Sequence, residues 1–274
     1  MSEYDFYPEP PHLSAAFYLD SKSPVDAFIQ VCERVEDTGA ISTGAFEVVR
    51  ANAIPQFSMI SDLAPRLESL RLHLQRGHEH EWKRLLNVIE PSVQVIRAAF
   101  DVPSVGLVTV AFEPIPDDSK PKALHPIAVS TSGALLSMPA SVSLSKRERQ
   151  QAVTVARFML TVFRSVCESL DPLYGTIQVE KNLPTPRELI LEKTRVGTEL
   201  FVSNRLCSVD TELERDLASI FRKGFSERWK TGIFFSGWAP FNPKRRTVAA
   251  PLEVGTRAAL RLGRALTVYL GPAL

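Results

Sequence analysis

The stretch that decides the fold runs from Val105 to Phe112 and reads VGLVTVAF. It is rich in β-branched residues, which favour a pleated, half-buried strand over a helix. Further strands are predicted at Leu124 to Ser130 and at Ala134 to Met138. The connections between the three strands are too short for a crossover helix, so we expect an antiparallel meander here.

On the N-terminal side, the sequence predicts a strand from Leu13 to Leu19 and a helix from Pro24 to Glu36. Ser23 is placed to cap this helix, and proline is favoured at the first helical position. A second strand is expected at Ile41 to Val49. Leucines at positions 63, 67, 70 and 74 then predict a helix that opens at Ser61-Asp62 and ends at Gly77. A further helix is expected from Glu79 to Ile89, restarting after Pro91 and continuing to Phe100.

On the C-terminal side, Ser145 and Glu148 form a capping box that opens the longest predicted helix, which runs to about Leu170. Thr211 and Glu214 indicate a second capping box, with its helix ending near Gly224. The remaining predicted elements are strands at Tyr174 to Glu180, Glu199 to Ser203 and Thr231 to Phe235, a short helix opening at Thr185-Pro186, and a last helix at Val254 to Leu270.

Because helices and strands interleave while the strands come in clusters, we expect an α+β fold with a mixed, largely antiparallel sheet packed against several helices. No flexible linker is evident in the sequence. The expected organisation is one domain over residues 1–274, and the alternative is two lobes of about residues 1–140 and 141–274.

Composition excludes several classes of protein. Hydrophobic residues make up 45% of the chain and charged residues 23%, which is typical of a globular protein and not of a disordered, collagenous or coiled-coil chain. No window reaches the ~18 apolar residues of a spanning helix. The first eleven residues carry acids and no Lys or Arg, unlike a secretory signal. We therefore expect a cytoplasmic protein without membrane attachment.

Charge is distributed unevenly along the chain. Residues 1–40 hold eight acids and two bases, whereas residues 223–274 hold nine bases and two acids. In the last predicted helix, Arg257, Arg261 and Arg264 recur at helical spacing and form a basic stripe. The two ends can neutralise one another in the fold, or the basic end can serve an acidic partner; the sequence leaves both interpretations open.

Motifs for catalysis, cofactors and metals are weak. The sequence has no G-x-S-x-G elbow and no glycine-rich phosphate loop, so we expect no cofactor and no nucleophilic catalytic residue. His78 and His80 are two residues apart, and helical metal ligands need a spacing of four, so no metal site is expected. The three cysteines are expected to be buried free thiols. An enzyme whose site is assembled from distant residues is an alternative, with Glu180, His125 and Asp117 as candidates.

The segment Arg228 to Arg246 (RWKTGIFFSGWAPFNPKRR) is the densest in aromatic residues. Aromatic rings and arginines on a loop are typical of binding hot spots. The predicted binding residues are Trp229, Trp238, Phe241, Lys244, Arg245 and Arg246. In the competing interpretation, this loop folds over the core and leaves the basic triplet as a solvated tip.

These features favour a protein-binding module, an inhibitor or immunity-type protein that acts on a partner protein through an aromatic and basic C-terminal surface. The alternatives are the enzyme described above and a nucleic-acid-binding protein. Nucleic-acid binding is disfavoured because such domains usually have an isoelectric point above about 9, and the value here is 7.8.

Overall fold

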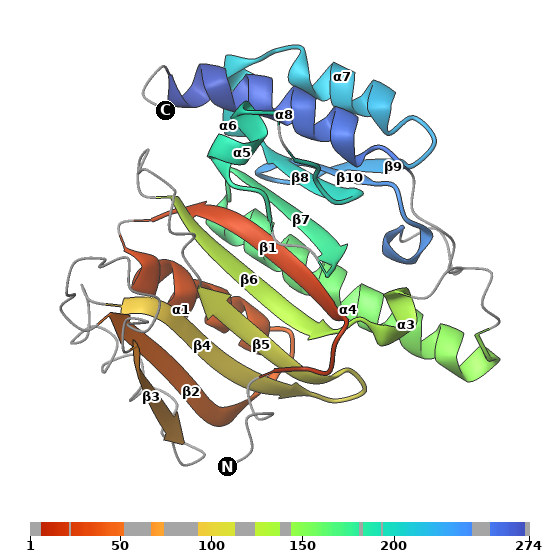
Figure 1. The fold of residues 1–274 in the computed structure, drawn as a ribbon. Helices are drawn as coiled ribbons and strands as arrows, with labels where there is room; N and C mark the ends of the chain where they lie inside the picture. The colour runs from red at the N-terminus through yellow and green to blue at the C-terminus, as the bar shows by residue number, and fades with distance from the viewer. Residues whose placement is uncertain are drawn as a thin grey trace, which may run out of the picture.

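A single sheet organises the described part of the computed structural model, which comprises residues 7–21, 23–51, 67–73, 93–112, 124–137, 144–180, 183–192, 194–242 and 253–271 (Figure 1). Ten strands follow the order β3-β2-β4-β5-β6-β1-β7-β8-β10-β9. Every pair of neighbouring strands is antiparallel. The α+β class and the largely antiparallel sheet are therefore confirmed.

The strands are β1 (His12–Asp20), β2 (Ile41–Ala51), β3 (Leu67–His73), β4 (Val93–Val102), β5 (Gly106–Phe112), β6 (Leu124–Ser132), β7 (Tyr174–Val179), β8 (Glu199–Ser203), β9 (Phe225–Arg228) and β10 (Gly232–Ser236). The helices are α1 (Pro24–Glu36), α3 (Ala134–Ser137), α4 (Lys146–Leu170), α5 (Pro186–Ile190), α6 (Asn204–Val209), α7 (Leu213–Ile220) and α8 (Gly255–Leu270), together with the 3-10 turn η2 (Ala239–Phe241).

The helices form two layers, one on each face of the sheet. Strand β1 shows the division, because alternate residues point to opposite faces. Phe17 packs in the cluster that contains α1 and α4. Tyr18 packs in the cluster that contains α5, α6, α7 and α8. In Figure 1, α1 and α4 lie behind the sheet, and α7 and α8 lie along the top of the molecule.

Local capping fixes the two helices of the first layer. The Ser23 side chain accepts a hydrogen bond from the backbone N–H of Asp26 and starts α1. The predicted capping box of α4 is confirmed, since Ser145 accepts from the Glu148 N–H and Glu148 accepts from the Ser145 N–H. Such caps satisfy backbone donors that a helix start leaves without partners.

Two predicted helices are wrong. Residues 67–73 form strand β3, with Leu72 paired to Phe46 of β2. Residues 93–100 belong to strand β4, where Ile96 and Phe100 are buried in the core. The apolar residues of β4 recur at a period of two, which buries one face of a strand. Residues 52–66 and 74–92, where the rest of these helices were predicted, lie outside the described residues.

Two smaller predictions are also wrong. Residues 134–137 form the helical turn α3 and no strand, because the backbone of Ser137 folds back to donate to the Gly133 carbonyl. Helix α7 begins at Leu213, and its N-cap residue, Glu212, makes no capping hydrogen bond through its side chain. The predicted cap does not form here, because Thr211 lies one residue before the N-cap and the carboxylate of Glu214 is paired with Arg228.

The sheet crosses the boundary between the two expected lobes, because β1 pairs with β6 on one side and β7 on the other. Within the described residues, no helix combines the length and the apolar character needed to span a membrane. The α8 helix of the basic C-terminal segment and the α1 helix of the acidic N-terminal segment lie on opposite faces of the sheet. These two charged helices therefore do not neutralise each other by contact.

Candidate interaction surface

Three of the predicted binding residues are buried aromatic side chains. Trp229 is 4% exposed, Trp238 7% and Phe241 0%. The Trp229 ring stacks on Phe234 at a centroid distance of 4.6 Å, and the guanidinium carbon of Arg164 lies 5.4 Å from the Trp229 ring centroid. In this conformation the three rings belong to the core between the sheet and α4, and they offer a partner little surface.

A buried carboxyl group holds the segment that carries Trp238. The Thr198 hydroxyl donates to Glu199 Oε2 at 2.6 Å, and the Ser236 hydroxyl lies 3.4 Å from Glu199 Oε1. Burial raises the pKa of Glu199 to about 8, although hydrogen bonds from Thr198 and from the Trp238 backbone oppose the increase. Sequence reasoning missed this residue because nothing in the residues around Glu199 indicates a buried carboxyl group.

Lys244, Arg245 and Arg246 lie outside the described residues. The last described residue before them is Asn242, which follows η2 directly. The basic triplet is therefore assigned to the candidate surface by sequence alone.

The predicted basic stripe on α8 divides into two kinds of arginine. Arg261 has a structural role. Its guanidinium donates to both carboxylate oxygens of Asp210, at 2.5 and 2.7 Å, and to Asp216 at 2.7 Å. These hydrogen bonds lower the pKa of Asp210. Arg257 and Arg264 are exposed, and no acidic partner is found for either among the described residues.

Exposed apolar side chains accompany these two free arginines. Val268, on the last turn of α8, is 59% exposed, and Leu191, directly after α5, is 50% exposed. Helix α5 packs closely on α8: a Cβ atom added at Gly263 would lie 2.2 Å from the Leu189 carbonyl oxygen. We call Arg257, Arg264 and Val268, which lie on one side of α8, the α8 surface.

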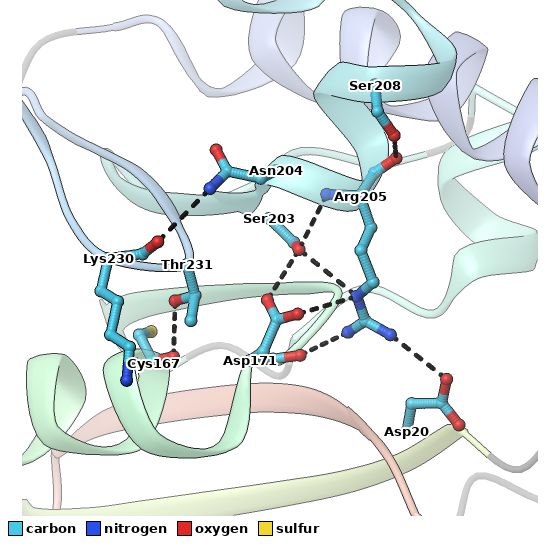
Figure 2. A network of polar contacts seen from close by, with 9 residues as sticks. All are labelled: Asp20, Cys167, Asp171, Ser203, Asn204, Arg205, Ser208, Lys230 and Thr231. Atoms are coloured by element: carbon cyan, nitrogen blue, oxygen red, sulfur yellow. Dashed lines mark hydrogen bonds and ion pairs between the residues drawn. The ribbon is translucent and has the colours of Figure 1, made fainter.

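A polar network joins the two helix layers at the end of the sheet (Figure 2). Arg205, at the start of α6, pairs with Asp171 Oδ2 at 3.1 Å and with Asp20 at 3.2 Å, and it also donates to the Asp171 carbonyl. Asp171 is the left-handed C-cap of α4 and accepts a hydrogen bond from the buried Ser203 hydroxyl at 2.7 Å. Figure 2 shows Arg205 between the two aspartates, so its role is to tie α4, β8 and β1 together.

The candidate catalytic residues Glu180 and His125 do not converge. The Glu180 backbone is bonded to His12 at one end of β1, whereas His125 is paired with Leu19 near the other end. Seven residues of an extended strand separate these positions by about 20 Å. Asp117 lies outside the described residues, as do His78 and His80. Among the residues that are described, no group of three potential metal ligands is found.

Comparison with solved structures finds a structural similarity at low sequence identity. The chain resembles the Pseudomonas aeruginosa T6SS protein PA0821, with a TM-score of 0.43 and 14% sequence identity, over 94% of this chain and 72% of that one. No family model and no curated protein matches the sequence. The function of this chain is therefore inferred from its own surface.

Proposed function

We propose that this chain is a protein-binding module that acts on a partner protein, as an inhibitor or immunity-type protein, through the α8 surface. One observation carries this proposal: Arg257 and Arg264 are exposed without an acidic partner in the described part of the chain, on the same helix as the exposed Val268. Arginine beside apolar surface is a common composition of binding hot spots.

The α8 surface is preorganised for binding. Helix α8 buries Ala258, Leu262 and Leu266 against the core, and it is clamped from the side by the Arg261 pairs with Asp210 and Asp216. A rigid helix loses little conformational entropy when a partner binds its exposed side. The chemistry of this side fits a partner that presents carboxylates around an apolar patch.

The first experiment identifies the partner. The tagged chain is used to capture bound molecules from the cells that make it, at low and at high salt, and both protein and nucleic acid are analysed. We expect one protein at a fixed stoichiometry, which binds less tightly at high salt because salt screens Arg257 and Arg264, and which is still retained through the apolar contact of Val268. Nucleic acid that is lost at high salt would contradict the proposal, since phosphate binding falls steeply with salt.

The second experiment links the captured protein to the α8 surface. Arg257→Glu with Arg264→Glu should weaken its affinity for the purified chain by at least about tenfold, because two attractive charges become repulsive. A matched change of two exposed arginines on the other helix layer, Arg147→Glu with Arg157→Glu, should leave this affinity unchanged. Equal affinity for both variants would overturn the assignment to α8.

The inhibitor role has its own readout. The activity of the captured protein is measured while the chain is added, and we expect inhibition that is complete at a fixed molar ratio. An unchanged activity at saturating binding would reduce the proposal to a binding module without inhibition.

A further inference from the structure

Helices α1 and α4 lie next to each other on one face of the sheet and carry opposite charge. They contact one another, and both pack in the same core cluster. Residues 24–37 hold four acids and one base, whereas residues 146–170 hold five bases and two acids. The net charges of the two segments are therefore equal in size and opposite in sign.

The exposed side of α1 is acidic. Asp26, Gln30 and Asp37 are exposed, and the spacing of these residues places them along one side of the helix. Asp26 has no ion-pair partner within the described residues, and Asp37 pairs with Arg34 next to its own helix. Asp26 therefore carries the unpaired negative charge on this exposed side of α1, whereas the charge of Asp37 is shared with Arg34.

The exposed side of α4 is basic. Residues 147, 150, 154, 157, 161 and 164 follow the alternating three-and-four spacing of one helix side, and they are Arg, Gln, Thr, Arg, Thr and Arg. Arg147 and Arg157 are exposed, and neither has an acidic partner among the residues described. Arg164 is paired with Glu168 and with Glu227 of β9.

We propose that the α1 and α4 layer is a dimer interface, in which the acidic side of α1 docks on the basic side of α4 of a second copy, and the reverse contact forms by two-fold symmetry. A two-fold axis turns one complementary pair of helices into two identical contacts. The match is self-complementary, because each copy carries one acidic and one basic helix side.

The size of the surface sets the expected strength of the dimer. At 1.5 Å per residue, α1 is about 20 Å long and α4 about 38 Å, and each helix is about 10 Å wide. Such a footprint is at the small end of specific interfaces, so the dimer should depend on concentration. The partly exposed Ile29 and Phe158 can add apolar contact beside the charges. Charge complementarity then fixes the orientation more than the affinity.

This inference goes beyond the proposed function and is independent of it. The dimer would use the helix layer opposite the α8 surface, because α1 and α4 lie on one face of the sheet and α8 on the other. A dimer would thus leave both α8 surfaces accessible to partners.

Charge exchange between the two helices tests the dimer. One variant carries Arg147→Glu and Arg157→Glu, and the other carries Asp26→Lys and Asp37→Lys. Sedimentation equilibrium at low salt should show a dimer for the unchanged chain, and its dissociation constant should rise at least about tenfold in each variant, because attraction becomes repulsion at both contacts. An equimolar mixture of the two variants should recover the dimer, since the exchanged charges are complementary again.

The mixture makes the test independent of folding defects. A misfolded variant could not regain association with the other variant, and thermal melting of each variant checks the fold separately. Arg257→Glu with Arg264→Glu is the matched control on α8 and should dimerise like the unchanged chain. The proposal is overturned by a monomeric unchanged chain at all concentrations, by variants that dimerise normally, or by a mixture that stays monomeric.

Discussion

Arg261 binds Asp210 through two parallel hydrogen bonds, Nη1 to Oδ2 at 2.5 Å and Nη2 to Oδ1 at 2.7 Å. This contact joins α8 to the residue that follows α6, and it uses the middle arginine of the basic stripe. The side chains are 11% and 17% exposed, so water screens the pair little. The stripe predicted from the sequence therefore supplies one structural arginine and two arginines that are available for binding.

Removing the Arg261 side chain should destabilise the fold. Arg261→Ala leaves the partly buried carboxylate of Asp210 without its guanidinium partner and removes one of the two arginines that pair with Asp216, which should lower the free energy of unfolding by about 2–3 kcal/mol. Arg257→Ala should change it by less than about 0.5 kcal/mol, because that side chain is exposed and unpaired. Urea unfolding of the unchanged chain, Arg261→Ala and Arg257→Ala measures both changes in the free energy of unfolding. An equal effect of the two substitutions would show that the Asp210 contact adds no stability.

The Arg261 pair should also lose its effect in acid. Hydrogen bonds from Arg261 lower the pKa of Asp210 below its usual value of 3.8 in the folded state. A lowered folded pKa contributes stability that is present above the unfolded pKa and is lost as pH falls through the folded pKa. The difference in stability between the unchanged chain and Arg261→Ala should thus be constant near pH 7 and shrink below about pH 4. Urea unfolding as a function of pH checks this, and a difference as large at pH 2 as at pH 7 would contradict it.

Glu199 should give the opposite pH dependence. Its folded pKa is about 8, above the usual 4.5, so the folded state keeps a proton that the unfolded state loses between these values. The stability of the unchanged chain should therefore decrease by up to about 1.4 kcal/mol per pH unit across this window from this group alone. Glu199→Gln, which stays neutral, should gain stability relative to the unchanged chain as pH rises from 5 to 8. A pH-independent difference would contradict a protonated Glu199.

Trp238 should act as a core residue. Trp238→Ala leaves a large cavity beside Phe241 and should lower the free energy of unfolding by about 3–5 kcal/mol. Trp238→Phe should cost clearly less, because it keeps an aromatic ring and removes an indole Nε1 that has no hydrogen-bond partner among the described residues. Thermal melting compares the two variants. If Trp238→Ala melted like the unchanged chain, the segment would not be part of the core.

The sequence predicted helix starts and strands correctly where a local signal, such as a capping residue or a β-branched run, favours the conformation that the tertiary contacts also favour. The capping box at Ser145 and the proline after Ser23 correctly located the starts of α4 and α1. The β-branched run at residues 106–112 is a central strand, as its composition predicts.

The errors arose where the spacing of apolar residues fits both the helical period of 3.6 and the strand period of two. Leucines at positions 67 and 70 match a helix, yet residues 67–73 pair with β2, and a window of seven residues cannot separate the two periods. Ile96 and Phe100 are four residues apart, which is compatible with a helix and also with a strand. Residues 93–102 form a strand because they pair with β2, which is distant in the sequence, and with β5, which follows them.

The candidate site was less accessible from sequence than the fold. The spacing of Arg257, Arg261 and Arg264 correctly indicates one basic side of α8. It cannot show that Asp210, 51 residues away, takes the central arginine. Likewise, the aromatic composition of residues 229–241 does not reveal whether the rings are buried, because core rings and interface rings share the same chemistry.

The central claim is that the two exposed arginines of α8 bind a partner protein, and one measurement tests it most directly. Three tagged chains are used side by side for capture from the same cells: the unchanged chain, Arg257→Glu with Arg264→Glu, and Arg147→Glu with Arg157→Glu. Quantitative mass spectrometry then compares the recovered proteins. We predict a protein that is depleted about tenfold or more with the α8 variant and is recovered in full with the α4 variant. Equal recovery with all three chains would contradict the account.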